Sequence, residues 1–331
     1  MTEKALRPER ASRPERALRL GTRRSALAMA QSELVAGAVR ELTGRPVELV
    51  EVTTYGDTSR EHLAQIGGTG VFASALRDAL LDGGVDFAVH SLKDLPTAPH
   101  DGLTLAAVPR REDPRDALVA RDGLTFEQLP AGARVGTGSP RRTALLHAYA
   151  RSHGLTIETV PIRGNIDTRI GYVHSGELDA VVLAAAGLHR IGRTDEVTDF
   201  LSVDTVLPAP GQGALAVECA AVNVDLAAVL AELDDPYTRV AVTAERSLLA
   251  ALEAGCSAPV GALADLLADG QVVTEMRLRG VVGTTDGSTL VQLSTTGPVP
   301  TSHSDASALG RELASEMLAK GAAGLMGERA L

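Results

Sequence analysis

Short apolar runs alternate with alanine- and leucine-rich amphipathic stretches in the first third of the chain. Arg19–Thr22, Val47–Thr53 and Phe87–Val89 are too short for helices and predict strands, the last of them buried. The stretches between them, Ala26–Leu42 and Val71–Leu81, predict helices. This strand–helix order is typical of a parallel α/β sheet with right-handed crossovers, so we expect such a sheet here.

The same pattern begins again after a polar segment, Arg110–Asp116, which predicts a crossing into a second α/β lobe. Three further strands are expected there, at Arg134–Gly136, Thr156–Pro161 and Ala180–Ala184. The proline- and glycine-rich segment Leu207–Gly213 predicts a second crossing, and Ala214–Glu218 a strand that returns to the first lobe. Two crossings are typical of two lobes hinged around a cleft.

From about Asp235 the pattern changes to a helix, two strands and a final helix, expected at Arg239–Glu253, Val272–Val282, Thr289–Ser294 and Ser304–Lys320. The expected fold is therefore α/β, with two lobes around a cleft and a smaller α+β C-terminal domain. The expected parts are residues 1–18 as a disordered tail, 19–112 with 212–232 as the first lobe, 113–211 as the second lobe and 235–331 as the third domain.

Composition excludes several classes of protein. A net charge of −10 and an aromatic content of 2% disfavour a nucleic-acid partner. No apolar run reaches the length of a membrane span or resembles a secretory signal, and the two cysteines do not indicate a disulfide framework. We expect a cytoplasmic protein. Residues 1–24 are basic, with eight cations and three acids. The tail within them either is simply solvated or contacts a polyanion.

Arginines and small residues follow three expected strands at the start of the next helix. The three stretches are Thr22-Arg23-Arg24-Ser25, Thr137-Gly138-Ser139-Pro140-Arg141-Arg142 and Arg163-Gly164-Asn165. Helix N-termini attract anions, and arginine binds carboxylate or phosphate with two parallel hydrogen bonds. Three such stretches in an otherwise acidic chain predict a small ligand with several negative charges. The alternative is that Ser25, Ser139 and Asn165 are only helix caps.

The segment VDFAVHSLKDLP, residues 85–96, places Lys93 and Asp94 just beyond a buried strand. Ligands bind at that end of the strands in open α/β sheets. The lysine would suit an anionic substrate and the aspartate a cationic intermediate, or the two could form a solvated charge pair.

Cys256 follows a helix-ending glycine and precedes Pro259, so it is expected on a loop, as a nucleophile, a covalent anchor or an inert residue. Cys219 is expected to serve packing. The histidines show no metal-binding spacing, and no metal site is expected.

Nine stretches in order from Arg19 to Gly261 resemble the hydroxymethylbilane synthase (porphobilinogen deaminase) family: RLGTRRSALAMAQ, AVHSLKDLP, REDPRDA, VGTGSPRR, RGNIDTR, LDAVVLAAAGL, LPAPGQGALAVEC, VTAERS and LEAGCSAPVG. The resemblance implies a monomeric transferase of haem biosynthesis whose first two lobes are like those of periplasmic binding proteins. It implies the condensation of four porphobilinogen molecules, with loss of ammonia, on one covalently bound dipyrromethane per chain. Water then releases hydroxymethylbilane.

The resemblance also implies residue roles. Cys256 would hold the cofactor through a thioether, and Asp94 would be catalytic, stabilising the cationic methylenepyrrolenine that forms when ammonia leaves. The implied cofactor-binding residues are Cys256, Lys93, Asp94, Thr137, Ser139, Arg141, Arg142, Arg163 and Gly164. The implied substrate-binding residues are Arg19, Arg23, Ser25, Arg163, Arg169 and Gln212.

Two positions depart from the family's pattern. In the segment Gly56–Gly70, which resembles a lid, Gln65 and Thr69 stand where the family often has lysines. The competing hypothesis is a two-lobed binding module without catalysis, which needs no covalent anchor such as Cys256.

Overall fold

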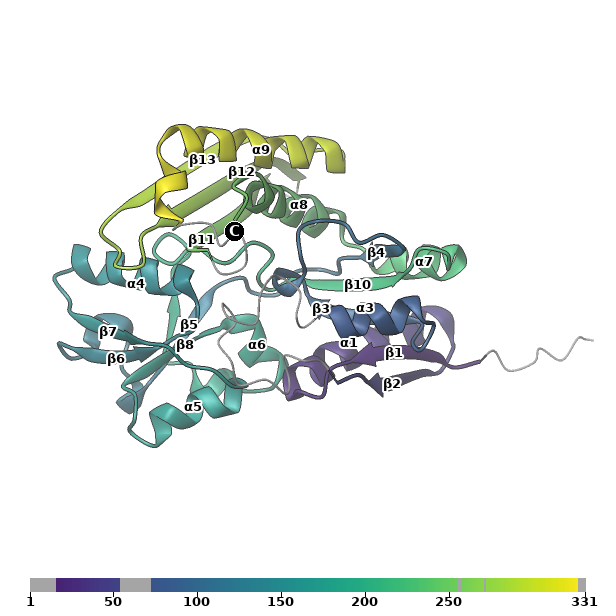
Figure 1. Cartoon of the computed structure of the whole chain (residues 1–331), viewed down its shortest axis with the longest axis horizontal. Helices are drawn as coiled ribbons and strands as arrows, with labels where there is room; N and C mark the ends of the chain where they lie inside the picture. Colours follow the sequence, from purple (N-terminus) through teal and green to yellow (C-terminus); the bar gives the residue numbers. More distant parts are fainter. Residues whose placement is uncertain (1–15, 54–72, 255–257, 271, 327–331) are drawn as a thin grey trace, which may run out of the picture.

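The computed structural model describes residues 16–53, 73–254, 258–270 and 272–326 of the chain. The expected tail up to residue 15, the lid segment with Gln65 and Thr69, and Cys256 lie outside the described residues. Figure 1 shows three sheet-containing parts: the first lobe, purple to blue with green segments where the chain returns to it, the teal second lobe, and the green-to-yellow third domain lying against both.

The first sheet has five strands in the order β2-β1-β3-β10-β4. Its strands are β1 (Leu18–Thr22), β2 (Val47–Glu51), β3 (Phe87–Ser91), β4 (Leu103–Ala107) and β10 (Leu215–Ala220). Strand β1 pairs in parallel with β2 and β3, as predicted, but β10 is antiparallel to β3 and β4. The predicted parallel unit of β1, β2 and β3 is confirmed. The direction of β10 was not predicted, because this strand arrives from the other lobe and no helical crossover fixes its direction.

The helices of the first lobe are α1 (Ala26–Thr43), α3 (Ser74–Leu81) and α7 (Val224–Leu230). Helix α1 begins as predicted, because the Ser25 hydroxyl accepts a hydrogen bond from Ala28 N at 3.3 Å. It ends at Gly44, whose φ of 68° is in the left-handed region that favours glycine.

The first lobe begins earlier than expected. Leu18 is part of β1, and Arg16 forms an ion pair of 2.7 Å with Asp86. The boundary of the tail at residue 18 is therefore wrong.

The second sheet repeats the plan of the first, in the order β7-β6-β8-β5-β9. Its strands are β5 (Asp116–Ala120), β6 (Ala133–Gly136), β7 (Ile157–Val160), β8 (Ala180–Ala184) and β9 (Asp199–Leu201). Its helices are α4 (Pro140–Ser152), α5 (Ile166–His174) and α6 (Ala185–Arg190). In each sheet three parallel strands adjoin one antiparallel strand that links the lobes: β5 enters this lobe, and β10 returns to the first. The predicted second α/β lobe with two crossings is confirmed.

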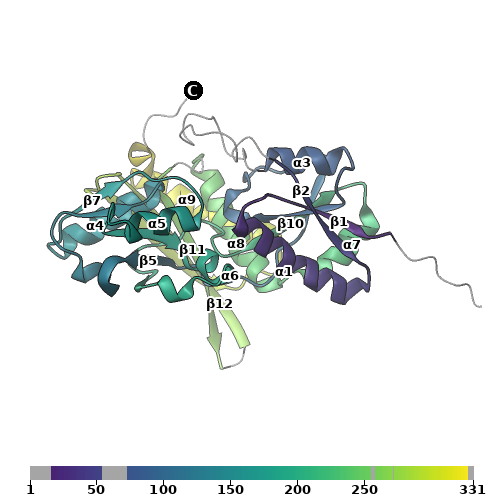
Figure 2. The same cartoon turned by 90° about the horizontal axis from the view of Figure 1, so that it is seen from below.

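The third part is an antiparallel sheet of β11 (Val260–Asp269), β12 (Val272–Gly283) and β13 (Leu290–Pro298). Helices α8 (Pro236–Ala251) and α9 (His303–Ala319) pack against it and each other around Leu248, Leu278 and Met317, all fully buried. The far end of the β11–β12 pair projects from the body of the molecule (Figure 2). The α+β domain is confirmed. Helix α8 begins earlier than expected, because the Asp235 carboxylate accepts from Thr238 N at 2.7 Å and caps it.

The fully buried carboxylate of Glu245, on α8, fastens the third domain to both crossings. It binds the guanidinium of Arg111 on the first crossing and accepts a hydrogen bond from Gly211 N, 2.7 Å away, on the second. It also accepts from Ala264 N on β11 at 2.9 Å. The third domain therefore holds both crossings between the lobes through Glu245. No helix in the described ranges combines the length and the apolar character needed to cross a membrane.

Candidate functional site

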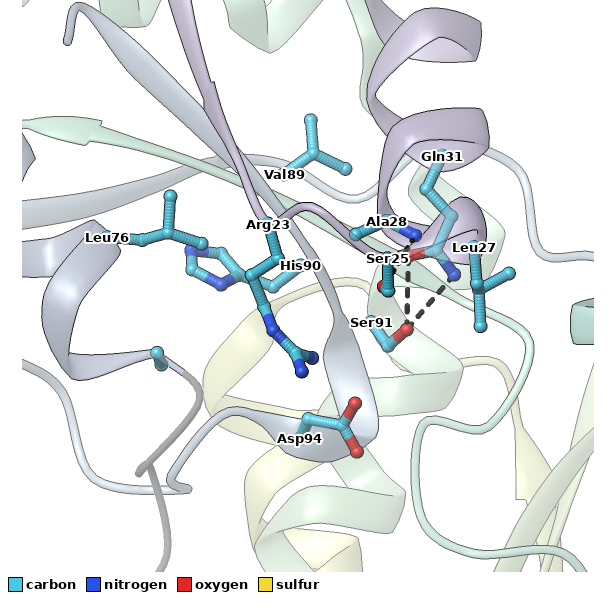
Figure 3. Close-up of a pocket in the computed structure, with 11 residues that line it drawn as sticks. Arg23, Ser25, Leu27, Ala28, Gln31, Leu76, Val89, His90, Ser91 and Asp94 are labelled. Atoms are coloured by element: carbon cyan, nitrogen blue, oxygen red, sulfur yellow. Dashed lines mark hydrogen bonds between the residues drawn. The ribbon is translucent and has the colours of Figure 1, made fainter. Parts of the chain in front are cut away.

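Polar side chains of the first lobe gather where β1 and β3 end. Arg23, Ser25 and Asp94 line one small pocket, together with His90 and Ser91. In Figure 3 the side chain of Arg23 extends in the direction of the Asp94 carboxylate. The predicted position of Asp94 beyond the carboxyl end of a buried strand is confirmed.

Lys93 and Asp94 lie on a single 3-10 turn, Leu92–Asp94, and the Asp94 side chain is exposed. Arg246, on α8 of the third domain, holds this turn. Its guanidinium donates to the carbonyl oxygens of Leu92 (3.1 Å), Leu95 (3.0 Å) and Pro96 (2.6 Å). Although VTAERS contains Arg246, sequence reasoning did not assign it to the site, because its partners are backbone atoms distant in sequence.

The second lobe contributes the N-termini of α4 and α5. Ser139 caps α4 by accepting from Arg142 N at 3.4 Å, and Asn165 caps α5 by accepting from Thr168 N at 2.8 Å. Thr137 is buried beside the first cap, and its hydroxyl accepts from Ser139 N at 3.2 Å. Gly164 has a φ of 107°, and a Cβ there would lie 2.8 Å from Thr168, so the turn requires glycine.

Four cations from the two lobes act on one another electrostatically. Burial and, to a smaller extent, the positive charge of Arg142 lower the pKa of Lys93 to about 8, against the opposing effect of Asp94. Burial likewise lowers the pKa of Arg169 to about 10, assisted by Arg142 and Arg163. The buried Nη1 atom of Arg163 has no hydrogen-bond partner in the described part of the chain. An anion would satisfy this atom and relieve the repulsion.

Asp116, at the start of β5, is a central residue that sequence reasoning missed. Its fully buried carboxylate accepts from Arg141 Nη2 (2.8 Å), from Arg142 Nε (3.1 Å) and Nη2 (2.8 Å), and from Gln212 Nε2 (2.9 Å). The three donors hold its pKa far below the usual range for aspartate, although burial alone would raise it. The available signal was the acid's place between a charged run and the apolar residues 117–120.

Arg141 and Arg142 are placed differently from the expectation. The Nε–Nη2 edge of Arg142 binds Asp116, and its Nη1 donates to the Val182 carbonyl at 2.9 Å. Arg141 is 3% exposed, and its Nη1 donates to the Leu207 carbonyl at 2.7 Å. In the ligand-free chain both arginines thus bind a buried acid of the protein, and their binding of cofactor carboxylates stays a prediction.

Gln212 joins this cluster to the first lobe. Its Nε2 donates to Asp116 and to the Pro114 carbonyl at 2.7 Å, and its Oε1 accepts from Lys93 Nζ at 3.2 Å. That Gln212 lines the substrate site stays a prediction.

Arg19 does not reach the site. Its guanidinium donates to Asp86 Oδ1 at 2.9 Å and to the Gly83 carbonyl at 2.8 Å, at the amino end of β3, whereas Lys93 and Asp94 follow its carboxyl end. Since Arg19 and Arg23 lie at opposite ends of β1, only Arg23 reaches the pocket. These contacts do not support substrate binding by Arg19, which rests on the resemblance alone.

Cys219 is fully buried in β10, which confirms its packing role, and burial raises the pKa of its thiol. Among the described residues, no group of three His, Cys, Asp or Glu side chains is arranged to hold a metal ion.

The fold and the site together define a class: a two-lobed α/β protein with a cationic site for a small polyanion where the lobes meet. Comparison with known protein families identifies this class more closely. Residues 18–228 match the family model "Porphobilinogen deaminase, dipyromethane cofactor binding domain", and residues 239–319 match "Porphobilinogen deaminase, C-terminal domain". The chain therefore belongs to the porphobilinogen deaminase family.

Similar proteins extend over nearly the whole chain. Porphobilinogen deaminase 1 of Streptomyces avermitilis is 84% identical over 318 residues, which are 95% of this chain and 98% of the relative. Porphobilinogen deaminase of Thermobifida fusca is 59% identical over 308 residues, covering 92% and 94%. Among solved structures, a periplasmic substrate-binding protein of an ABC transporter from Coxiella burnetii is 12% identical, with a TM-score of 0.42 over 67% of this chain and 93% of that one.

Proposed function

We propose that the residues at the meeting point of the two lobes carry out the reaction of the porphobilinogen deaminase family. Four porphobilinogen molecules are condensed head to tail with loss of ammonia, and water releases hydroxymethylbilane. The observation that carries this proposal is the group of mutually repelling cations beside Asp94 in a chain that matches the family from residue 18 to residue 319.

The donor set fits dipyrromethane, since each of its pyrroles carries an acetate and a propionate. Among the described residues, the buried Nη1 of Arg163 lacks a hydrogen-bond partner. Lys93 and Arg169 have lowered pKa values, as expected for cations in a site whose carboxylate ligands are not bound. When bound, the cofactor supplies a covalently anchored pyrrole chain to which the first substrate unit is joined. Its anchor is Cys256, and the side chains proposed to hold it are Lys93, Asp94, Thr137, Ser139 and Arg163, with Gly164 allowing close approach.

Arg23, Ser25 and Arg169 are proposed to bind the carboxylates of the incoming porphobilinogen, with Gln212 beside them. Ser25 lies at the N-terminus of α1, where the backbone N–H groups and the helix dipole favour a carboxylate. Arg23 lines the same pocket as Asp94, so a carboxylate on Arg23 places the reacting carbon of the substrate near the Asp94 oxygen atoms.

Asp94 is proposed as the catalytic residue. As ammonia leaves porphobilinogen, positive charge develops on the pyrrole and its methylene carbon. A carboxylate that is already in position stabilises this charge and accepts a hydrogen bond from the pyrrole N–H. Because Arg246 and Pro96 fix the turn, Asp94 does not need to reorganise during the reaction.

The division of the chain and its state in solution are further proposals. The pairing of β10 with β3 supports a first lobe of residues 16–112 with 212–232, a second of 113–211 and a third domain of 235–331. A monomer is proposed from the family to which the chain belongs, and a cytoplasmic location from that family and from two cysteines that indicate no disulfide framework. Sedimentation equilibrium and cell fractionation test these two points.

The test of the function is incubation of the purified chain with porphobilinogen. We expect release of ammonia and hydroxymethylbilane, and an intact mass above the sequence mass by two deaminated porphobilinogen units. A two-lobed binding module would bind the pyrrole acid without ammonia release and without an adduct, and that result would reject the proposal.

A further inference from the structure

Asp116 connects β5, helix α4, the return crossing and, indirectly, the first lobe. It lies on the strand by which the chain enters the second lobe, its arginine partners lie on α4, and its amide partner, Gln212, lies on the return crossing. Through Gln212 the connection reaches Lys93 in the first lobe.

We propose that Asp116 is a positioning residue. It fixes the edges of Arg141 and Arg142 and, through Gln212, the ammonium of Lys93, so that the cations facing the ligand keep one arrangement across the two lobes. The inference deepens the proposed function and rests on it only where turnover is measured.

The orientation of the Gln212 amide carries the argument. Its Nε2 donates to the carboxylate of Asp116 and to the carbonyl of Pro114, so its oxygen atom must face Lys93. An asparagine at position 116 can turn its own NH₂ toward Gln212. The Pro114 carbonyl alone would then hold the Gln212 amide in this orientation, and a rotated amide would present its NH₂ group to the ammonium of Lys93, which has no acceptor to offer.

The negative charge of Asp116 also favours the charged form of Lys93. The positive charges of Arg142 and Arg141 lower the pKa of Lys93, and the negative charges of Asp94 and Asp116 raise it. Removal of the Asp116 charge leaves Arg141 and Arg142 without their shared anion and leaves Lys93 in a more positive environment. This effect would lower the pKa of Lys93, which a loss of folded protein alone would not do.

The experiment compares Asp116→Asn with Asp113→Asn, a matched control on the same crossing whose carboxylate binds Arg115 instead. The chain has only three lysines, Lys4, Lys93 and Lys320. Reductive methylation with ¹³C-formaldehyde therefore gives a small set of NMR signals, and Lys93→Arg identifies the one that belongs to Lys93.

In Asp116→Asn we expect the titration midpoint of Lys93 to fall by about half a pH unit or more relative to the parent chain. We also expect KM for porphobilinogen to rise severalfold while kcat changes less, because a displaced Lys93 weakens a carboxylate contact that is present throughout the reaction. Asp113→Asn should leave both quantities unchanged. An unchanged Lys93 midpoint in folded Asp116→Asn, or a loss of activity that follows only the loss of folded protein, would overturn the proposal.

Two further variants keep the test decisive. If Asp116→Asn does not fold, Asp116→Asn with Arg141→Gln removes both opposite charges together, and the Lys93 midpoint is measured there. Gln212→Met interrupts the link alone, so the shifts of Gln212→Met and Asp116→Asn should not add in the double variant. Fully additive shifts of the Lys93 midpoint would show that Asp116 does not act on Lys93 through Gln212. A shifted midpoint in a parent chain that shows no turnover would support the positioning role and reject the proposed function.

Discussion

The ammonium of Lys93 and the side-chain oxygen of Gln212 lie 3.2 Å apart, although 119 positions separate them in the chain. Lys93 belongs to a turn of the first lobe, whereas Gln212 belongs to the segment that returns from the second. The position of the Lys93 ammonium therefore depends on Gln212, which lies on the crossing between the two lobes. The site is complete only when both crossings and the third domain, which holds them through Glu245, have folded.

The two cysteines should behave differently. Cys256→Ala should fold but carry no adduct and release no hydroxymethylbilane, because the thioether has no sulfur to form on. Cys219→Ala should keep the adduct and lose about 1 kcal/mol or more of stability, since Cys219 is fully buried. Intact mass and thermal unfolding measure both properties. An adduct on Cys256→Ala would show that Cys256 is not the residue that holds the cofactor.

Arg163 and Arg141 form a second pair with opposite expectations. Arg163→Gln should impair assembly of the cofactor while Tm of the ligand-free chain stays the same or rises, because the replacement removes a cation with an unsatisfied buried atom. Arg141→Gln should lower the free energy of unfolding by about 3 kcal/mol, because it leaves Asp116 with one fewer charged partner in the interior. Mass spectrometry and urea unfolding separate the two effects. Equal stability losses in the two variants would contradict the assignment.

The sequence was informative where local rules decide the structure. The caps Ser25, Ser139 and Asn165 and the strand Ala180–Ala184 lie where the pattern places them, because capping and apolar runs depend on neighbouring residues. The position of Asp94 was predictable for the same reason: a buried strand followed by a turn places it at the edge of the sheet.

The remaining features depend on partners distant in sequence. The direction of β10 is set by its return from the second lobe, and β11 is rich in alanine and leucine, so its strand character comes from pairing with β12. An arginine beside a helix start looks the same whether it binds a ligand or a buried acid. Only the tertiary structure shows that Arg19 binds Asp86 and that Arg142 binds Asp116.

Lys93 should make stability depend on pH in the chain that lacks the cofactor. Its pKa of about 8 lies below the ordinary value of 10.5, so the folded state disfavours the charged lysine. The resulting loss of stability is full below pH 8 and disappears as the pH rises to about 10.5. In the Cys256→Ala background, Lys93→Met should therefore stabilise the chain by about 1 kcal/mol or more at pH 7, and by less at pH 10. Chemical unfolding at both pH values tests this, with the exposed Lys320→Met as control. A gain of equal size at both pH values would show that the charge of Lys93 is not its cause.

Glu218 should govern part of the acid stability. Burial would raise the pKa of this carboxyl, but His90, with Nε2 at 3.2 Å, and Arg77, with hydrogen bonds of 3.0 and 2.7 Å, lower it to about 2. Its contribution is present above the ordinary value near 4.5 and is lost as the pH falls through about 2. Glu218→Gln should cost about 3 kcal/mol at pH 7 and clearly less at pH 3, measured by urea unfolding. Glu33→Gln, in an exposed pair with Arg40, is the control and should change little. A cost independent of pH would contradict the assignment.

The most direct test of the central claim compares Asp94→Asn with Lys93→Met in steady-state kinetics on porphobilinogen, after intact mass has shown that each variant carries the cofactor. Where Asp94→Asn lacks it, incubation with preformed hydroxymethylbilane should install it. Asp94 faces charge that develops only as ammonia leaves, so Asp94→Asn should lower kcat by about a hundredfold, or roughly 3 kcal/mol of barrier. Lys93 binds a carboxylate that is present throughout the reaction, so Lys93→Met should mainly raise KM. A near-normal kcat for cofactor-loaded Asp94→Asn would contradict the catalytic role given to Asp94.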